Sequence, residues 1–227
     1  MMDFAAKDFI KIGHRGASAY EPENTIKSFE RAIDMGCDFV ELDVRLSFDG
    51  HLVVMHDKTV DRTTDGWGDV AHKTLDHLKR LDAGGGERIP TLEEVMGLAK
   101  GRAGVAIELK EEGTEKGVVE TVRAHGMVED VIVISFHRGL ISRVKAIEPK
   151  IKTGYLYLLQ INPVGKALEC SADLICPYHR LVSKGLIRRA FEAGVFIAPW
   201  TVDSPKRAES LRSMGVKGIA TNRPDVI

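Results

Sequence analysis

Short runs of β-branched and other apolar residues alternate along the whole chain with longer stretches in which apolar positions recur every three or four residues. Runs of the first kind are typical of buried strands, and stretches of the second kind are typical of amphipathic helices. Repetition of this pair predicts βα units around a parallel sheet. We expect eight strands, at residues 10–13, 39–46, 105–109, 131–136, 153–158, 174–177, 196–202 and 218–221.

The predicted helices carry recognisable end signals. Thr91 followed by Glu94 forms a capping box, which predicts that a helix begins there. Other helical patterns end at a glycine, as at Gly126 and Gly215, where a left-handed cap costs least. The clearest helical patterns cover residues 25–35, 92–99, 117–125, 139–147, 184–193 and 205–214.

The number and order of these elements favour an α/β fold of the TIM (β/α)₈ barrel type, although periodicity alone also allows an open sheet. The chain has 227 residues, so we predict a single domain over residues 1–227. Residues 57–90 run too long for an ordinary βα loop and contain a short helical pattern near residues 75–81. They predict a small insertion after the second strand, on the rim where such barrels keep their active sites.

Composition excludes several classes of partner. Lys and Arg number 32 against 33 Asp and Glu, a formal net charge of -1, so nucleic acid is a poor candidate. No apolar stretch reaches the roughly 20 residues of a membrane helix, and the first residues, which include Asp3 and Asp8, lack the features of a secretory signal. Cys37, Cys170 and Cys176 have no ligand-like spacing, which suits buried thiols and a cytoplasmic location.

Carboxylates gather at the predicted mouth of the barrel. Glu41 and Asp43 are two residues apart in a strand, so both side chains point to one face, and Glu108 adds a third acid in the next strand. Buried carboxylates are costly unless a cation or proton neutralises them. Hard divalent ions prefer oxygen ligands, so we predict one divalent cation, Mg²⁺ or Ca²⁺, with Mn²⁺ also possible. The structural alternative is ion pairing with Arg45 or Lys110.

Two histidines and two cations are expected beside these acids. His14 and Arg15 follow the first strand, and His56 ends the extension of the second. An imidazole with a pKa of about 6.5 can give or take a proton at neutral pH. The guanidinium of Arg15 and the ammonium of Lys110 suit a phosphate group. Alternatively, Arg15 pairs with Glu21, Glu23 or Glu41, and Lys110 pairs with Glu108.

Two further candidates have both a functional and a structural interpretation. Asn24 precedes a predicted helix, so it is either the helix N-cap or a hydrogen-bond donor to the site. Trp200 lies near the end of the seventh predicted strand, where it packs against a small alcohol or simply within the barrel. The sequence alone leaves both pairs of alternatives open.

These residues occur in an order and spacing that a known family shares. The motifs are HRG at residues 14–16, PENT at 22–25, ELDV at 41–44, HD at 56–57, RTT at 62–64, IPTLE at 89–93, Glu108 with Lys110, SF at 135–136 and WTVD at 200–203. They extend over nearly the whole chain, and the combination is specific although each part is weak. The sequence resembles the glycerophosphodiester phosphodiesterases.

The resemblance implies a TIM barrel whose insertion covers a site for a small-molecule glycerophosphodiester. In that family hydrolysis releases sn-glycerol 3-phosphate and an alcohol. The resemblance does not say which histidine is the base, which alcohol leaves, or how many copies assemble. The implied roles are metal ligation by Glu41, Asp43 and Glu108, acid and base catalysis by His14 and His56, and phosphate binding by Arg15 and Lys110.

Two departures from the family pattern leave details open. Residues 84–86 are glycines where many relatives have bulky aromatic residues, and His137 stands where an acid or amide is more common. The same site would also suit a lysophospholipase D-like or cyclising phosphodiesterase. More distant alternatives are a Schiff-base enzyme with Lys110 as nucleophile, and a barrel that binds without turnover.

Overall fold

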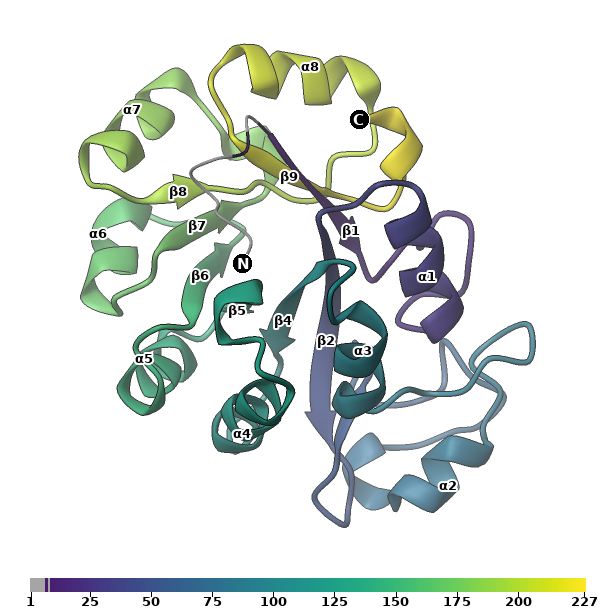
Figure 1. The fold of residues 1–227 in the computed structure, drawn as a ribbon. Helices are drawn as coiled ribbons and strands as arrows, with labels where there is room; N and C mark the ends of the chain where they lie inside the picture. Colours follow the sequence, from purple (N-terminus) through teal and green to yellow (C-terminus); the bar gives the residue numbers. More distant parts are fainter. Residues whose placement is uncertain (1–6, 8) are drawn as a thin grey trace.

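In the computed structural model, which describes residue 7 and residues 9–227, parallel strands curl into a barrel with helices around its outside (Figure 1). The arrangement is the predicted TIM barrel. Asp3 and Asp8, which entered the prediction about secretion, lie outside the described residues. Within the described residues, no helix combines the length and the apolar character needed to cross a bilayer.

The described residues form a nine-stranded sheet in the order β8-β7-β6-β5-β4-β2-β1-β9, with β3 paired to β2. The eight strands on this path pair in parallel, whereas β3 runs antiparallel to β2. The strands are β1 (Ile10–His14), β2 (Phe39–Leu46), β3 (Leu52–Val54), β4 (Gly104–Leu109), β5 (Val131–Ser135), β6 (Lys152–Tyr157), β7 (Leu174–Pro177), β8 (Phe196–Ile197) and β9 (Gly218–Thr221).

The barrel closes between β8 and β9 through an irregular segment, residues 198–202. The amide of Ala220 donates to the Pro199 carbonyl at 3.0 Å, and the amide of Val202 donates to the Ala220 carbonyl at 2.9 Å. The expected strand over residues 196–202 was therefore too long, since β8 ends at Ile197. Pro199 has no amide hydrogen, so it cannot continue a regular ladder.

Helices lie outside the barrel and follow the predicted positions closely. The capping box of Thr91 and Glu94 is present at the start of α3. The main helices are α1 (Ile26–Asp34), α2 (Leu75–Arg80), α3 (Leu92–Ala99), α4 (Glu115–His125), α5 (Arg138–Ile147), α6 (Pro163–Glu169), α7 (Lys184–Glu192) and α8 (Pro205–Ser213), and single 3₁₀ turns occur at η1 (Val70–His72), η2 (Val128–Asp130), η3 (His179–Leu181) and η4 (Pro224–Val226).

The side chains of strand β2 alternate between the apolar layer beneath the helices and the interior of the barrel. Val40, Leu42 and Val44 belong to the apolar layer between sheet and helices. The alternate residues Glu41 and Asp43 are also buried, and they lie on the inner side of the barrel because successive side chains of a strand point to opposite faces. The predicted period of two is thus confirmed, and it brings acids into the barrel interior.

The segment after β3 folds into a small insertion with its own apolar cluster, which includes Val60, Val70, Leu78 and Ile89. It contains η1 and α2, and it returns to the barrel at α3. Its first residues place His56 at the mouth of the barrel. A single domain over residues 1–227 remains a prediction.

Candidate active site

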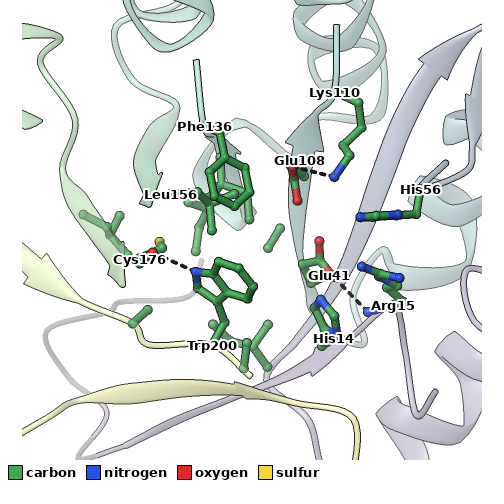
Figure 2. A pocket seen from close by; sticks show the side chains of 17 residues that line it. His14, Arg15, Glu41, His56, Glu108, Lys110, Phe136, Leu156, Cys176 and Trp200 are labelled. Atoms are coloured by element: carbon green, nitrogen blue, oxygen red, sulfur yellow. Dashed lines mark hydrogen bonds and ion pairs between the residues drawn. The ribbon is translucent and has the colours of Figure 1, made fainter. Parts of the chain in front are cut away.

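A cavity of about 140 Å³ opens at the carboxyl ends of the strands and has two chemically different walls (Figure 2). Its position is the one that catalytic sites occupy in TIM barrels. The polar wall consists of His14, Arg15, Glu41, His56, Glu108 and Lys110, and the facing apolar wall includes Ile134, Phe136, Leu156, Leu174, Ala198 and Trp200.

The three predicted acids form one cluster. Asp43 in β2 is the register partner of Glu108 in β4. Glu41 precedes Asp43 by two residues in β2, so its side chain points to the same face of the sheet. One carboxylate oxygen from each of the three lies within 4.8 Å of the others. All three side chains are buried, and the Oδ1 atom of Asp43 has no hydrogen-bond partner. A buried carboxylate oxygen that accepts no hydrogen bond, within a cluster of three acids, fits a hard divalent cation.

The protonation of the cluster supports the same conclusion. Burial raises the pKa of Glu41 and of Glu108 to about 8, and the negative charge of Asp43 adds to the effect. Burial would also raise the pKa of Asp43, but Lys110 and Arg15 outweigh it and hold that pKa at about 2. Without a cation, Glu41 and Glu108 therefore keep protons at neutral pH, and a divalent ion would replace them.

Lys110 and Arg15 border the acids as permanent cations. The Lys110 Nζ atom lies 2.8 Å from Glu108 Oε1 and 3.3 Å from Asp43 Oδ1. Burial alone would lower the pKa of Lys110, but Asp43 and Glu108 outweigh it and raise that pKa. A protonated amine is not a nucleophile, so the Schiff-base hypothesis loses its chemical basis.

Arg15 is held by contacts through both its backbone and its side chain. Its amide donates to Glu41 Oε2 at 2.8 Å, and its Nη1 atom donates to Glu23 Oε1 at 2.9 Å. Its Nε atom, 3.4 Å from Asp43 Oδ2, has no hydrogen-bond partner. The predicted pairing with carboxylates is present, and the guanidinium still lines the cavity.

His14 is oriented by a chain of hydrogen bonds from the last strand. Its Nδ1 atom lies 2.7 Å from Asn222 Oδ1, which also accepts from the Ser18 hydroxyl at 2.8 Å. The Asn222 Nδ2 atom donates to Asp203 Oδ2 at 2.7 Å, which fixes the orientation of the amide. His14 therefore holds a hydrogen on Nδ1 and leaves Nε2 for the cavity. Burial and the nearby Arg15 lower the pKa of His14.

His56 has a charged partner instead. Its Nδ1 atom lies 2.6 Å from Asp57 Oδ1, and Asp57 Oδ2 accepts from Arg62 Nε at 2.6 Å. Arg62 also donates to Glu23, and Glu23 accepts from Arg15. These ion pairs connect the segment that carries His56 with the segment that carries His14. Burial lowers the pKa of His56, while Asp43 and Asp57 oppose the change. The hydrogen bond from Arg62 holds the pKa of Asp57 at about 2.

Asn24 lies behind the site. Thr25 caps α1, so the interpretation of Asn24 as the N-cap was wrong. The Asn24 Nδ2 atom donates to Asp43 Oδ2 at 2.9 Å, and its backbone adopts the left-handed conformation with φ of 59°. Asn24 does not line the cavity, and it contacts the site through Asp43.

Trp200 belongs to the apolar wall. Its Nε1 atom donates to the Cys176 carbonyl at 2.8 Å, and its ring meets Phe136 edge-on with centroids 5.6 Å apart. It packs within the barrel and faces the cavity at the same time (Figure 2). His137 and residues 84–86 are not among the residues that line the cavity.

Sequence reasoning missed the residues that hold the two histidines. Asn222 and Ser18 were given no role, and Asp57, Arg62 and Asp203 appeared only as parts of motifs. Asn222 directly follows β9, so a polar residue at the end of a barrel strand was an available signal. Its hydrogen bond to His14 connects the first strand with the residue after the last strand. A local sequence pattern cannot predict a contact between residues so far apart in the chain.

Comparison with known proteins agrees with this geometry. Residues 14–226 match the model of the glycerophosphoryl diester phosphodiesterase family. A glycerophosphodiester phosphodiesterase of Caldanaerobacter subterraneus is 40% identical to the chain over 96% of each protein. The family match therefore covers the chain from the end of β1 onward and includes every predicted site residue.

Two solved structures are similar throughout. A glycerophosphodiester phosphodiesterase from Agrobacterium tumefaciens has a TM-score of 0.87 and 34% identity, covering 96% of this chain and 98% of the other. A phosphodiesterase from Oleispira antarctica, solved in complex with the product sn-glycerol-3-phosphate, has a TM-score of 0.89 and 29% identity, covering 95% and 94%.

Proposed function

The chain belongs to the glycerophosphoryl diester phosphodiesterase family, a family of enzymes, and on that premise we propose that it hydrolyses glycerophosphodiesters to sn-glycerol 3-phosphate and an alcohol in a cation-dependent reaction. The observation that carries the proposal is the convergence of two differently partnered histidines on three buried carboxylates. The bound product in the Oleispira antarctica relative supports the choice of product.

Glu41, Asp43 and Glu108 would hold one divalent cation, with Mg²⁺ or Ca²⁺ preferred and Mn²⁺ acceptable to the same oxygen donors. Such a cation supplies charge stabilisation at the phosphoryl group and lowers the pKa of a nearby hydroxyl. Asn24 contributes by fixing Asp43, which makes it a positioning residue rather than a substrate ligand.

Arg15 and Lys110 would bind the phosphodiester. Both cations line the cavity beside the acids, and their charges persist at neutral pH because neighbouring carboxylates raise both pKa values against the effect of burial. They would stabilise the negative charge that is redistributed in the transition state. Trp200 and Phe136, on the facing wall, would pack against the carbon part of the substrate.

The different partners of the histidines suggest different roles in proton transfer. His56 would take on Nε2 a proton of the attacking water as the water oxygen bonds to phosphorus, because Asp57 stabilises the imidazolium that forms. His14, in its protonated form, would give its Nε2 proton to the oxygen of the departing alcohol as the phosphorus–oxygen bond breaks. The lowered pKa of His14 makes its protonated ring a stronger acid.

We also propose a cytoplasmic location and a small-molecule substrate. Cys37, Cys170 and Cys176 are buried and form no disulfide, as expected of a protein in a reducing compartment. Fractionation of cells that produce the protein tests the location, and recovery outside the cytoplasmic fraction would contradict it.

The function is tested by measuring sn-glycerol 3-phosphate released from a panel of glycerophosphodiesters. The purified protein is assayed as prepared, after EDTA treatment, and after addition of Mg²⁺, Ca²⁺ or Mn²⁺. We expect release that EDTA abolishes and a divalent cation restores. Release that persists in EDTA would refute the role of the cation, and absence of release from every diester with every cation would refute the activity.

A further inference from the structure

Half of the catalytic rim exposes large apolar side chains to solvent. Strands β5, β6, β7 and β8 are neighbours in the sheet, so the segments that follow them lie side by side at the mouth (Figure 1). The segment after β6 exposes Leu158, Leu159 and Ile161 by 58%, 85% and 91%, and Phe136 after β5 is also exposed. We call Phe136, Leu158, Leu159 and Ile161 the apolar rim. Clustered exposure of this kind marks an interaction surface.

The apolar rim continues the apolar wall of the cavity. Phe136 belongs to both, and Leu156, which lines the cavity, lies two residues before Leu158. In Figure 2, Phe136, Leu156 and Trp200 stand together on the side of the cavity opposite the acids and histidines. Apolar residues therefore extend from the cavity wall, at Phe136 and Leu156, into the exposed segment after β6.

Basic residues border the apolar rim. The segments after β5, β6, β7 and β8, with the first residues of their helices, contain Arg138, Arg180, Lys184 and Lys206 but only one acid, Asp203. Arg138 pairs with Glu169, whereas Arg180, Lys184 and Lys206 make no ion pair with any residue that the structure describes. The carboxylate of Asp203 accepts hydrogen bonds from Thr221 and Asn222. This half of the rim is therefore locally positive.

Charges of both signs are mixed on the other half of the rim. The insertion over residues 57–90 contains seven acidic and six basic residues, and its neighbouring segments carry Glu21, Glu23, Glu111 and Glu112 as well as Arg15 and Lys110. Glu23 pairs with Arg15 and Arg62, and Glu111 pairs with Arg45. An anionic surface would therefore be attracted to the apolar and basic side more than to this mixed side.

We propose that the apolar rim and its basic border dock the protein on an anionic lipid surface. Leu158, Leu159 and Ile161 would enter the boundary between headgroups and acyl chains, while the bordering cations meet lipid phosphates. A second copy of the chain fits less well, because a two-fold contact through the same patch would bring the basic borders together. Docking does not depend on the proposed function. If both hold, the cavity would open towards lipid-borne glycerophosphodiesters.

Co-sedimentation with vesicles tests docking without any turnover. Vesicles of phosphatidylcholine with about 30% phosphatidylglycerol are compared with pure phosphatidylcholine, at low salt and at about 1 M salt. We expect binding to the anionic vesicles that is at least about tenfold stronger than to neutral ones and that salt weakens. Binding to neither vesicle, or equal binding to both, would overturn the proposal.

Variants identify the surface. Leu159→Glu combined with Ile161→Glu should reduce binding to anionic vesicles at least about tenfold, while its circular dichroism and hydrolysis of a water-soluble diester stay those of the wild type. Phe191→Glu is the matched control, because Phe191 is 84% exposed near the end of α7 that faces away from the rim. Phe191→Glu should bind as the wild type does.

Two results from the variants would overturn the proposal. The first is undiminished binding by the double variant, or an equal loss in Phe191→Glu. The second is a combination of two observations: the wild type does not bind vesicles, and light scattering shows that the wild type is a dimer whereas the double variant is a monomer. The rim would then join two copies of the chain. Failure of the protein to hydrolyse any diester would refute the proposed function and leave the vesicle result interpretable.

Discussion

The two site histidines differ in the charge of the group that accepts from Nδ1. Asn222 offers His14 a neutral amide oxygen, whereas Asp57 offers His56 a carboxylate. A carboxylate favours the imidazolium form and an amide does so only weakly. The site therefore separates two chemically identical side chains into groups with different proton affinities, which is what a paired acid and base require.

Removal of either imidazole should stop proton transfer while leaving the barrel folded. We expect His14→Ala and His56→Ala each to lower kcat by a factor of roughly 10² to 10⁴, the usual contribution of a general acid or base. His72→Ala, in the same insertion as His56 but exposed, is the control and should retain the wild-type rate. Steady-state kinetics and far-ultraviolet circular dichroism measure the two properties. A wild-type rate in either site variant would show that its histidine is not catalytic.

Asp57→Asn should lower the pKa of His56 further below its ordinary value of 6.5. Asp57 raises that pKa by favouring the imidazolium, so removing its charge disfavours the protonated ring. The shift is measured by following the ring proton of His56 by NMR as pH is varied. Lys58→Asn changes the neighbouring residue, which does not contact His56 in the structure, and serves as control. A rise or no change in the His56 pKa would contradict the interpretation of the pair.

At the scale of single residues, local pattern was enough for some of the site and not for the rest. Glu41, Asp43 and Glu108 follow from the two-residue period of strands, and His14 and His56 from their places at strand ends. Asn222 and Asp203 could not be assigned in this way. Asn222 contacts His14 across 208 positions of sequence, and only closure of the sheet brings them together.

Among the elements, β2 and β4 share the longest register in the barrel and approach closely at their first residues. Gly104 in β4 pairs with Phe39 in β2, whose side chain is fully buried. A Cβ atom at Gly104 would overlap the Phe39 ring. The close approach fixes the two strands that supply all three carboxylates, at the end of the barrel opposite the cavity.

Gly104→Ala should therefore destabilise the fold by about 1–3 kcal/mol, as overpacking of a dense core does. Gly97→Ala is the matched control, because Gly97 lies within α3 and a Cβ atom there would meet nothing within 4 Å. The control should be stabilising by roughly 0.5–1 kcal/mol through helix propensity. Urea denaturation gives both values. Equal stability of the two variants would show that the β2–β4 contact is looser than described.

Element boundaries could be predicted where end signals are strong. The capping box placed α3 correctly, whereas α6 was not predicted. A signal did exist, since Asn162 caps α6 and Pro163 occupies its first turn. Strand β8 was extended too far because the apolar run was weighed more heavily than Pro199 within it.

For the whole molecule, the buried acids link stability to pH and to the cation. Between the ordinary pKa of 4.5 and the folded value of about 8, folded Glu41 and Glu108 hold protons that the unfolded chain has released. The unfolding free energy of the cation-free protein should therefore fall as pH rises through this range. A cation bound by the acids would offset this loss of unfolding free energy. It should bind more tightly at higher pH, because fewer protons then compete for the carboxylates.

Added Ca²⁺ or Mg²⁺ should raise Tm more at pH 9 than at pH 6. A cation at about 100 times its Kd contributes roughly 2.7 kcal/mol, enough to shift Tm by several degrees. Differential scanning calorimetry in EDTA and in cation measures the difference. In Glu108→Gln, most of the cation-induced rise in Tm should be lost. Glu115→Gln, which removes a buried acid outside the cluster, should keep the wild-type rise in Tm. A larger shift at pH 6 than at pH 9 would contradict the ligand assignment.

At this scale the sequence predicted a barrel from the number and alternation of its elements, and the structure confirms it. Closure itself was not encoded in any local pattern. It depends on pairing of Ile10–His14 with Gly218–Thr221 and on the irregular segment around Pro199, and these contacts join residues that are distant in sequence.

The pairing of β1 with β9 also sets the order in which a newly made chain becomes active. A ribosome releases β1 first and β9 last, so His14 emerges long before Asn222 can reach it. A nascent chain that has emerged only as far as β8 contains all three acids and both histidines, yet His14 lacks its partner and β1 has a free edge. Catalytic competence would thus appear only after β9 and Asn222 have emerged, and chains stalled before β9 would be inactive.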